Sequence, residues 1–176
     1  MEEIVTLFVT AKCDPPLAFQ LFNDGMKRTH LQTQPFLWNI EDRGFPFLGA
    51  QVWIKAGTEQ TGGAFNLFEA ILPSGFETPL HIHYAEDVAI QVLEGALDLY
   101  WGADKKQAVA GSFFYQPRGI PHGFRVAGSG PARILYLTLP AGLDGFVLAH
   151  GRPLSDSDVP VSEAQYKIEV LGSLPV

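Results

Sequence analysis

Residues 75–95 carry the sequence GFETPLHIHYAEDVAIQVLEG, in which His81 and His83 are separated by a single residue. The run around them has the character of a short β-strand, and residues i and i+2 of a strand point to the same face. Both imidazoles can therefore reach one metal ion. Taken alone, such a pair is only a weak indication of a metal site.

A second stretch, residues 111–126, carries the sequence GSFFYQPRGIPHGFRV and supplies a third histidine, His122. Pro117, Gly119 and Pro121 mark a turn immediately before this histidine. The residues between the two stretches, 96–110, are predicted to form a hairpin with a charged tip at residues 102–106.

The pattern around both stretches predicts an all-β sandwich or barrel. The chain has 18 glycines and 13 prolines, and they separate short apolar segments at turn-like intervals. Strands are predicted over residues 49–55, 64–72, 80–83, 88–93, 96–101, 107–110, 112–116, 123–126 and 133–138. An earlier strand is predicted over residues 4–9, followed by a short helix from Asp14 to Gly25. Beyond Pro140 the strand pattern is lost, and residues 143–149 and 162–166 are predicted to form short helices on the outside.

Composition narrows the class of protein. The 176 residues are enough for one compact domain, and the formal charge of −7 with no basic run argues against a nucleic-acid partner. The apolar run at residues 4–9 is too short for a signal peptide, and no stretch approaches the roughly 20 apolar residues of a membrane helix. Cys13 is the only cysteine, so an internal disulfide is impossible. We therefore expect a cytoplasmic protein without a membrane partner.

Together the two stretches resemble the cupin superfamily. Its first motif is a glycine, five residues, H-x-H, three or four residues, a glutamate, six residues and a glycine; its second is a glycine, five residues, P-x-G, two residues, a histidine, three residues and an asparagine. The matching positions are Gly75, His81, His83, Gly95, Gly111, Pro117, Gly119 and His122. The resemblance implies a jelly-roll β-barrel, also called a double-stranded β-helix, with His81, His83 and His122 as metal ligands.

The resemblance also divides the chain. It implies an N-terminal extension at residues 1–44, the barrel at 45–140 and a C-terminal extension at 141–176 packed on the barrel. The wider sequence is similar to single-domain bacterial cupins described as quercetin-dioxygenase-like. For these, one divalent transition metal ion is implied, and Fe, Ni, Zn, Co, Mn and Cu all stay open.

Two positions depart from the motifs. Val88 stands where the family has a glutamate that is both metal ligand and base, and Val126 stands where it has an asparagine. Asp87 is the alternative by spacing, but alternation along the strand points it outward. Glu86 shares the inward parity and is the better substitute as a catalytic carboxylate, although it lies in the turn.

The expected pocket is mostly apolar, with walls from residues on the inner faces of the strands: Val88, Ile90, Val92, Phe113, Tyr115 and Phe124. The leading expected function is a mononuclear metal-dependent dioxygenase for a small aromatic or enolic substrate. A non-oxidative metal-dependent isomerase or lyase, and an inactive cupin that binds a small molecule, are the alternatives. Because the apolar strand at residues 4–9 would expose an unpaired edge, we also expect a homodimer in which this strand is exchanged or paired.

Overall fold

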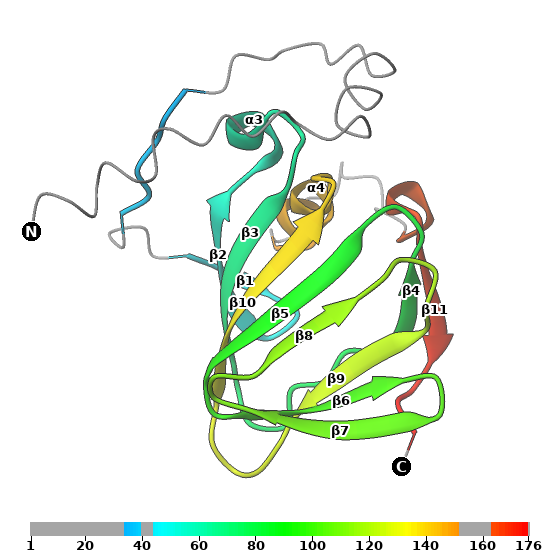
Figure 1. The fold of residues 1–176 in the computed structure, drawn as a ribbon. Coiled ribbons are helices and arrows are strands. Elements are labelled where there is room, and N and C mark those ends of the chain that lie inside the picture. The colour runs from blue at the N-terminus through cyan, green and yellow to red at the C-terminus, as the bar shows by residue number, and fades with distance from the viewer. Residues whose placement is uncertain (1–33, 40–43, 152–162, 176) are drawn as a thin grey trace, which may run out of the picture. The chain divides into compact units, whose positions relative to one another are not determined.

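Two antiparallel sheets enclose the core in the computed structural model, which describes residues 34–39, 44–151 and 163–175 (Figure 1). The six-stranded sheet has the order β1-β2-β3-β10-β5-β8. Its strands are β1 (Phe45–Phe47), β2 (Ala50–Ala56), β3 (Asn66–Leu72), β10 (Ala132–Leu139), β5 (Asp87–Glu94) and β8 (Phe113–Gln116). The five-stranded sheet has the order β11-β4-β9-β6-β7. Its strands are β11 (Ile168–Gly172), β4 (Leu80–His83), β9 (His122–Val126), β6 (Ala96–Trp101) and β7 (Asp104–Val109).

Within the described residues, three short helical elements accompany the sheets: α3 (Thr58–Thr61), α4 (Leu143–His150) and the 3-10 helix η1 (Glu163–Tyr166). No helix in the described part of the chain is long and apolar enough to cross a membrane. The strand predicted at residues 4–9 and the helix predicted from Asp14 to Gly25 lie outside the described residues.

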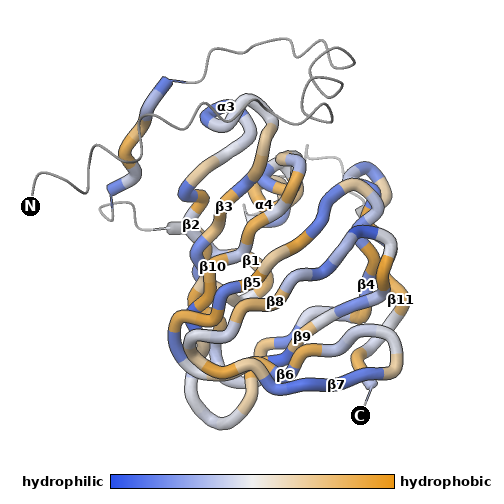
Figure 2. The backbone as a smooth tube through the Cα atoms, viewed as in Figure 1, coloured by the Kyte–Doolittle hydropathy of each residue, from blue (hydrophilic) through white to orange (hydrophobic). Residues whose placement is uncertain are grey.

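The core forms where the inner faces of the two sheets meet. Val88, Ile90 and Val92 alternate along β5 and are all almost fully buried, as the period of two in a strand requires. From the opposite sheet Leu97, which is 0% exposed, packs into the same cluster. Burial of such a side chain contributes about 1.5–3 kcal/mol to the stability of the folded state. Figure 2 shows hydrophobic stretches in the strands of both sheets.

The predicted all-β jelly-roll class is confirmed, with differences at the sheet edges. The edge strands β1 and β11 were not predicted, and β7 begins at Asp104 rather than at residue 107. Asp104 pairs with Trp101, so the hairpin tip is only two residues long. β11 runs antiparallel to β4 and pairs Ile168 with His83. Such edge strands are short and gain their stability from the partner strand, which local sequence patterns do not reveal.

The geometry of the turn between β5 and β6 requires a glycine at Gly95, the last glycine of the first motif. It connects β5 to β6 with a φ of +75°, a conformation that side chains disfavour. A Cβ atom there would lie 2.5 Å from the carbonyl oxygen of Pro131. Only glycine allows these two segments to approach so closely.

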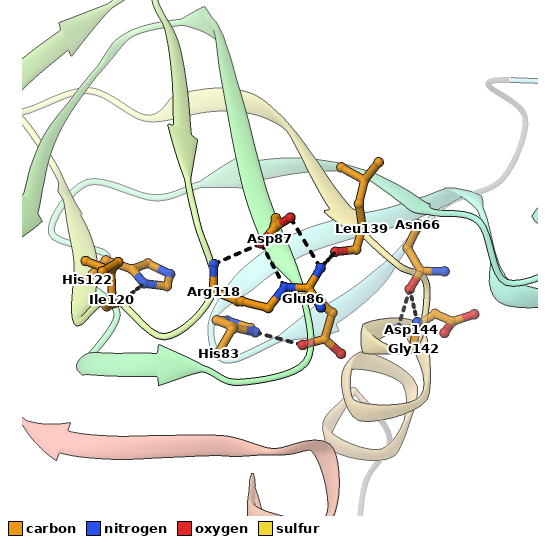
Figure 3. Close-up of polar contacts among 10 residues, drawn as sticks. All are labelled: Asn66, His83, Glu86, Asp87, Arg118, Ile120, His122, Leu139, Gly142 and Asp144. Carbon is orange, nitrogen blue, oxygen red and sulfur yellow. Dashed lines mark hydrogen bonds and ion pairs between the residues drawn. The ribbon is translucent and has the colours of Figure 1, made fainter. Parts of the chain in front are cut away.

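A buried polar network fixes α4 to the larger sheet. Asn66, which is 0% exposed, accepts hydrogen bonds through Oδ1 from the N–H groups of Gly142 (2.8 Å) and Asp144 (3.2 Å). Asp144 in turn accepts bonds from the N–H group (2.7 Å) and the hydroxyl (2.6 Å) of Thr58. These contacts hold the start of α4 against β3 and α3, as Figure 3 shows for Asn66.

Candidate metal centre

Three histidines come together on two neighbouring strands of the smaller sheet. His81 and His83 lie on β4, and His122 on β9 is the direct cross-strand partner of His81. All three are buried, and their ring centroids are 4.5 to 5.5 Å apart. Their candidate ligand atoms lie within 4.8 Å of one another. Among the described residues this is the one group of three or more such side chains with the spacing to hold a metal ion.

The hydrogen bonds of the rings orient them as metal ligands. Nδ1 of His81 lies 2.8 Å from the carbonyl oxygen of Pro79, and Nδ1 of His122 lies 2.9 Å from that of Ile120. A carbonyl can only accept, so each Nδ1 carries the proton and Nε2 keeps its lone pair. Nε2 of His122 is buried and has no partner among the described residues. A buried nitrogen without a partner is costly in an empty pocket and is what an ion would satisfy.

The histidines are also in the protonation state that metal binding needs. Burial, together with the neighbouring imidazoles, lowers the pKa of His81 to about 4 and that of His122 to about 3. Both rings are therefore neutral at pH 7, and only a neutral imidazole has a free lone pair. Together with the ring orientation, this donor set fits a divalent transition metal ion.

The turn before β9 is anchored directly to β4. The N–H group of Gly119 donates a 2.8 Å hydrogen bond to the carbonyl oxygen of His83. Gly119 has a φ of +79°, so the second glycine of this motif permits the turn that makes the contact. This bond ties the segment that leads to His122 to the strand that carries the other two histidines.

Of the three residues considered for the family glutamate, only Glu86 reaches the histidines. It is 4% exposed, and its Oε2 atom lies 3.4 Å from Nδ1 of His83 (Figure 3). Glu86 therefore contacts the ring nitrogen that the other two histidines direct toward carbonyls. A carboxylate at this nitrogen fixes the ring orientation and raises the basicity of the ligand.

Asp87 forms an ion pair with Arg118, and Val88 belongs to the hydrophobic core. Asp87 accepts bonds from the backbone N–H (2.9 Å), Nε (2.9 Å) and Nη2 (3.2 Å) of Arg118, which also donates to the carbonyl oxygen of Leu139 at 3.2 Å. The Arg118 guanidinium holds the pKa of Asp87 down at about 2. Asp87 thus faces outward, as alternation predicted, and this pair joins β5, β10 and the turn before β9. Val88 is 1% exposed and packs in the core.

A cavity of about 190 Å³ lies beside the histidines, between the two sheets and under α4. Its lining is mostly apolar, and His81 and His83 form part of its wall. The other lining residues include, from the strands, Phe47, Val52, Phe68, Ala70, Phe124, Tyr136 and Ile168, and from α4, Leu143, Phe146 and Val147. The site therefore combines three imidazoles with a mostly apolar cavity, whose wall includes two of them.

The structure places the predicted pocket residues in three different environments. Phe124 lines this cavity, whereas Val88, Ile90 and Val92 are buried in the core outside its lining. Phe113 and Tyr115 are 65% and 52% exposed on β8, so they do not form a pocket wall. The sequence has aromatic residues at both parities of this strand, and it is Phe114 that packs inward, against Trp101.

Apart from Phe124, His81 and His83, the cavity wall was not predicted, and two of the parts that were missed are informative. Tyr136 follows Ile134 at the inward spacing on β10, and this alternation was a usable signal. The α4 residues Leu143, Phe146 and Val147 also face the cavity, although this helix was predicted only as an outer covering.

Comparisons with known proteins agree with the motifs. A sequence model of the cupin domain matches residues 67–138. Quercetin 2,3-dioxygenase of Bacillus subtilis (strain 168) is 27% identical over 133 residues, covering 73% of this chain and 38% of that protein. The uncharacterized protein MJ1618 of Methanocaldococcus jannaschii is 33% identical over 75 residues, covering 43% of this chain and 60% of that protein. The chain thus spans less than two thirds of either relative.

A solved structure shares the fold. KdgF from Halomonas sp. aligns with a TM-score of 0.56 at 22% identity, covering 64% of this chain and 99% of that one. Identity this low shows a common fold and carries no statement about activity. Residues 67–138 therefore match the cupin domain, and the two sheets of the described residues have the cupin jelly-roll fold.

Proposed function

We propose that His81, His83 and His122 hold one divalent transition metal ion, and that the protein is a metal-dependent dioxygenase for a small aromatic or enolic substrate. The observation that carries this proposal is the shared orientation of the buried rings. His81 and His122 turn Nδ1 toward a carbonyl and His83 turns it toward Glu86, so that Nε2 is left on each ring for an ion.

A metal held here would supply Lewis acidity toward a substrate oxygen and open positions for further ligands. Three neutral imidazoles bring no charge to balance a dication, so this site favours an anionic substrate such as an enolate. The carboxylate of Glu86 contacts one of these imidazoles, with Oε2 at 3.4 Å from Nδ1 of His83. Because Glu86 lies at the Nδ1 side of His83 and outside the cavity lining, we assign to its carboxylate the role of orienting this ring rather than that of a base in contact with the substrate.

The apolar cavity supports substrate binding at the same place. Because His81 and His83 belong to its wall, a molecule inside the cavity lies beside the histidines. Exclusion of water from such a pocket strengthens the attraction between a charged substrate oxygen and its partners. The similarity to quercetin 2,3-dioxygenase supports oxygen chemistry, although the matched region is only 38% of that protein.

One observation favours a second candidate. Val88 occupies the position of the family glutamate and is buried in the core. A site that lacks this ligand also suits an isomerase or lyase that uses its metal only as a Lewis acid, or a cupin that binds a small molecule without turnover.

Metal analysis of protein purified without added metal, combined with an oxygen electrode, separates these candidates. The screen uses 1,2-diphenols and β-diketones as substrates and the double variant His81→Ala/His83→Ala as the control. A redox-active metal with oxygen uptake, both lost in the variant, is the expected result. Zinc without oxygen uptake would favour the non-oxidative enzyme, and neither metal nor uptake would favour the inactive binder; both outcomes contradict the dioxygenase.

A further inference from the structure

Tyr136 is the one polar side chain in the cavity wall, among the described residues, whose polar atoms take part in no hydrogen bond. Glu77 binds Nε of Arg125 at 2.7 Å, and the hydroxyl of Thr78 accepts the N–H of Phe124 at 3.0 Å. His81 and His83 use Nδ1 for Pro79 and Glu86. The phenol of Tyr136 is thus left to interact with whatever enters the cavity.

The position of this phenol is well defined. Tyr136 lies within β10, hydrogen-bonded to strands on both sides, with Phe68 and Ile90 as its cross-strand neighbours. Its ring meets that of Phe68 edge to face, with centroids 6.3 Å apart. Burial, with a contribution from Glu86, raises its pKa well above the ordinary value. The hydroxyl therefore keeps its proton at neutral pH and acts as a hydrogen-bond donor.

The size of the cavity limits what can enter. Its volume is about 190 Å³. Pockets for drug-sized ligands have about 300–1,000 Å³. A molecule with one ring or a short chain fits this space, and a three-ring flavonol exceeds it.

We propose that Tyr136 determines specificity by donating a hydrogen bond to one oxygen of the substrate while a neighbouring oxygen lies at the three histidines. The substrate class is then a single-ring or short-chain compound with two adjacent oxygens, such as a 1,2-diphenol or an enediol. This inference deepens the proposed function and rests on its metal site, but it concerns recognition and needs no oxygen chemistry.

Binding to the zinc-loaded protein tests it, because zinc has no redox chemistry and turnover cannot interfere. Calorimetry compares three probes, namely catechol with two adjacent oxygens, phenol with one, and the flavonol quercetin. The variant Tyr136→Phe removes only the hydroxyl and keeps the ring against Phe68. Tyr100→Phe is the matched control, since Tyr100 is also buried but lies on β6 outside the cavity lining.

Catechol should bind the wild type more tightly than phenol or quercetin. Tyr136→Phe should weaken catechol binding about tenfold, the effect of one hydrogen bond, and leave phenol binding unchanged. Tyr100→Phe should alter neither, and thermal unfolding should confirm that both variants fold. The inference would be overturned if Tyr136→Phe weakened catechol and phenol binding equally, or if it did not weaken catechol binding. It would also be overturned if the wild type bound quercetin more tightly than catechol. If the iron-loaded protein takes up no oxygen but still distinguishes these probes, the dioxygenase proposal is refuted and this inference stands.

Discussion

Glu86 contacts His83 through Nδ1, with Oε2 at 3.4 Å, and not through the position that the cupin motif reserves for a carboxylate. That position holds Val88, which is packed in the core. If His83 held a metal ion through Nε2, the Glu86 carboxylate would lie behind this ligand and not beside the ion. A negative charge there still supports a cation bound by the histidines, because it polarises the imidazole that lies between them.

Replacing Glu86 by glutamine keeps its shape and removes its charge. We expect Glu86→Gln to weaken zinc binding about 10- to 100-fold, the usual effect of losing a carboxylate behind a metal-bound histidine. Competition with a chelator measures this affinity. Glu94→Gln, the same change at an exposed residue, should leave it unchanged. Equal affinities for wild type and Glu86→Gln would remove Glu86 from the site.

The buried histidines make the stability of the metal-free protein depend on pH. The pKa values of His81 and His122 are lowered to about 4 and about 3 from 6.5, so the unfolded chain takes up protons before the folded one does. Their stabilising effect is therefore complete above pH 6.5 and is lost as the pH falls below it. Each ring adds a slope of about 1.4 kcal/mol per pH unit between pH 6 and 5.

Urea unfolding at several pH values with a chelator present measures this slope. His122→Gln should reduce it by one ring's share, whereas His150→Gln, outside the cluster, should not reduce it by that amount. A slope in the His122 variant equal to that of the wild type would show that this ring is not kept neutral by burial.

The motif glycine Gly95 offers a test of the fold. Gly95→Ala places a Cβ atom 2.5 Å from the Pro131 carbonyl oxygen at a φ of +75°. Gly128→Ala is its control, because Gly128 has a φ of +80° and open space around the new Cβ atom. The control should lose about 1–2 kcal/mol of unfolding free energy from backbone strain alone. Gly95→Ala should lose clearly more, and equal losses would argue against the close approach.

The sequence predicted the parts of this molecule that depend on spacing and alternation. Two motifs identified the three histidines, and the parity of β5 predicted that Asp87 faces outward. The prediction that Phe113 and Tyr115 on β8 face the pocket was wrong, because a run of three aromatic residues supplies no alternation. The cavity wall from α4 could not be predicted, because it depends on contacts such as Asn66 with Gly142, residues that are 76 positions apart.

The oligomeric state stays a prediction from the sequence. Residues 4–9 have high β-propensity and no charge, and they lie outside the described residues. We expect a homodimer in solution in which this segment is paired across the interface. Light scattering should give the mass of a dimer for the full chain and of a monomer for a chain that begins at Gln34. A monomeric full chain, or a shortened chain that dimerises equally well, would contradict this expectation.

The metal content of the purified protein tests the central claim most directly. After exposure to zinc and removal of excess metal, elemental analysis should find one ion per chain in the wild type and in His150→Gln. The double variant His81→Ala/His83→Ala should retain none, provided that circular dichroism shows it to be folded. Absence of bound metal in the wild type, or an undiminished ion in the folded double variant, would contradict a metal centre at His81, His83 and His122.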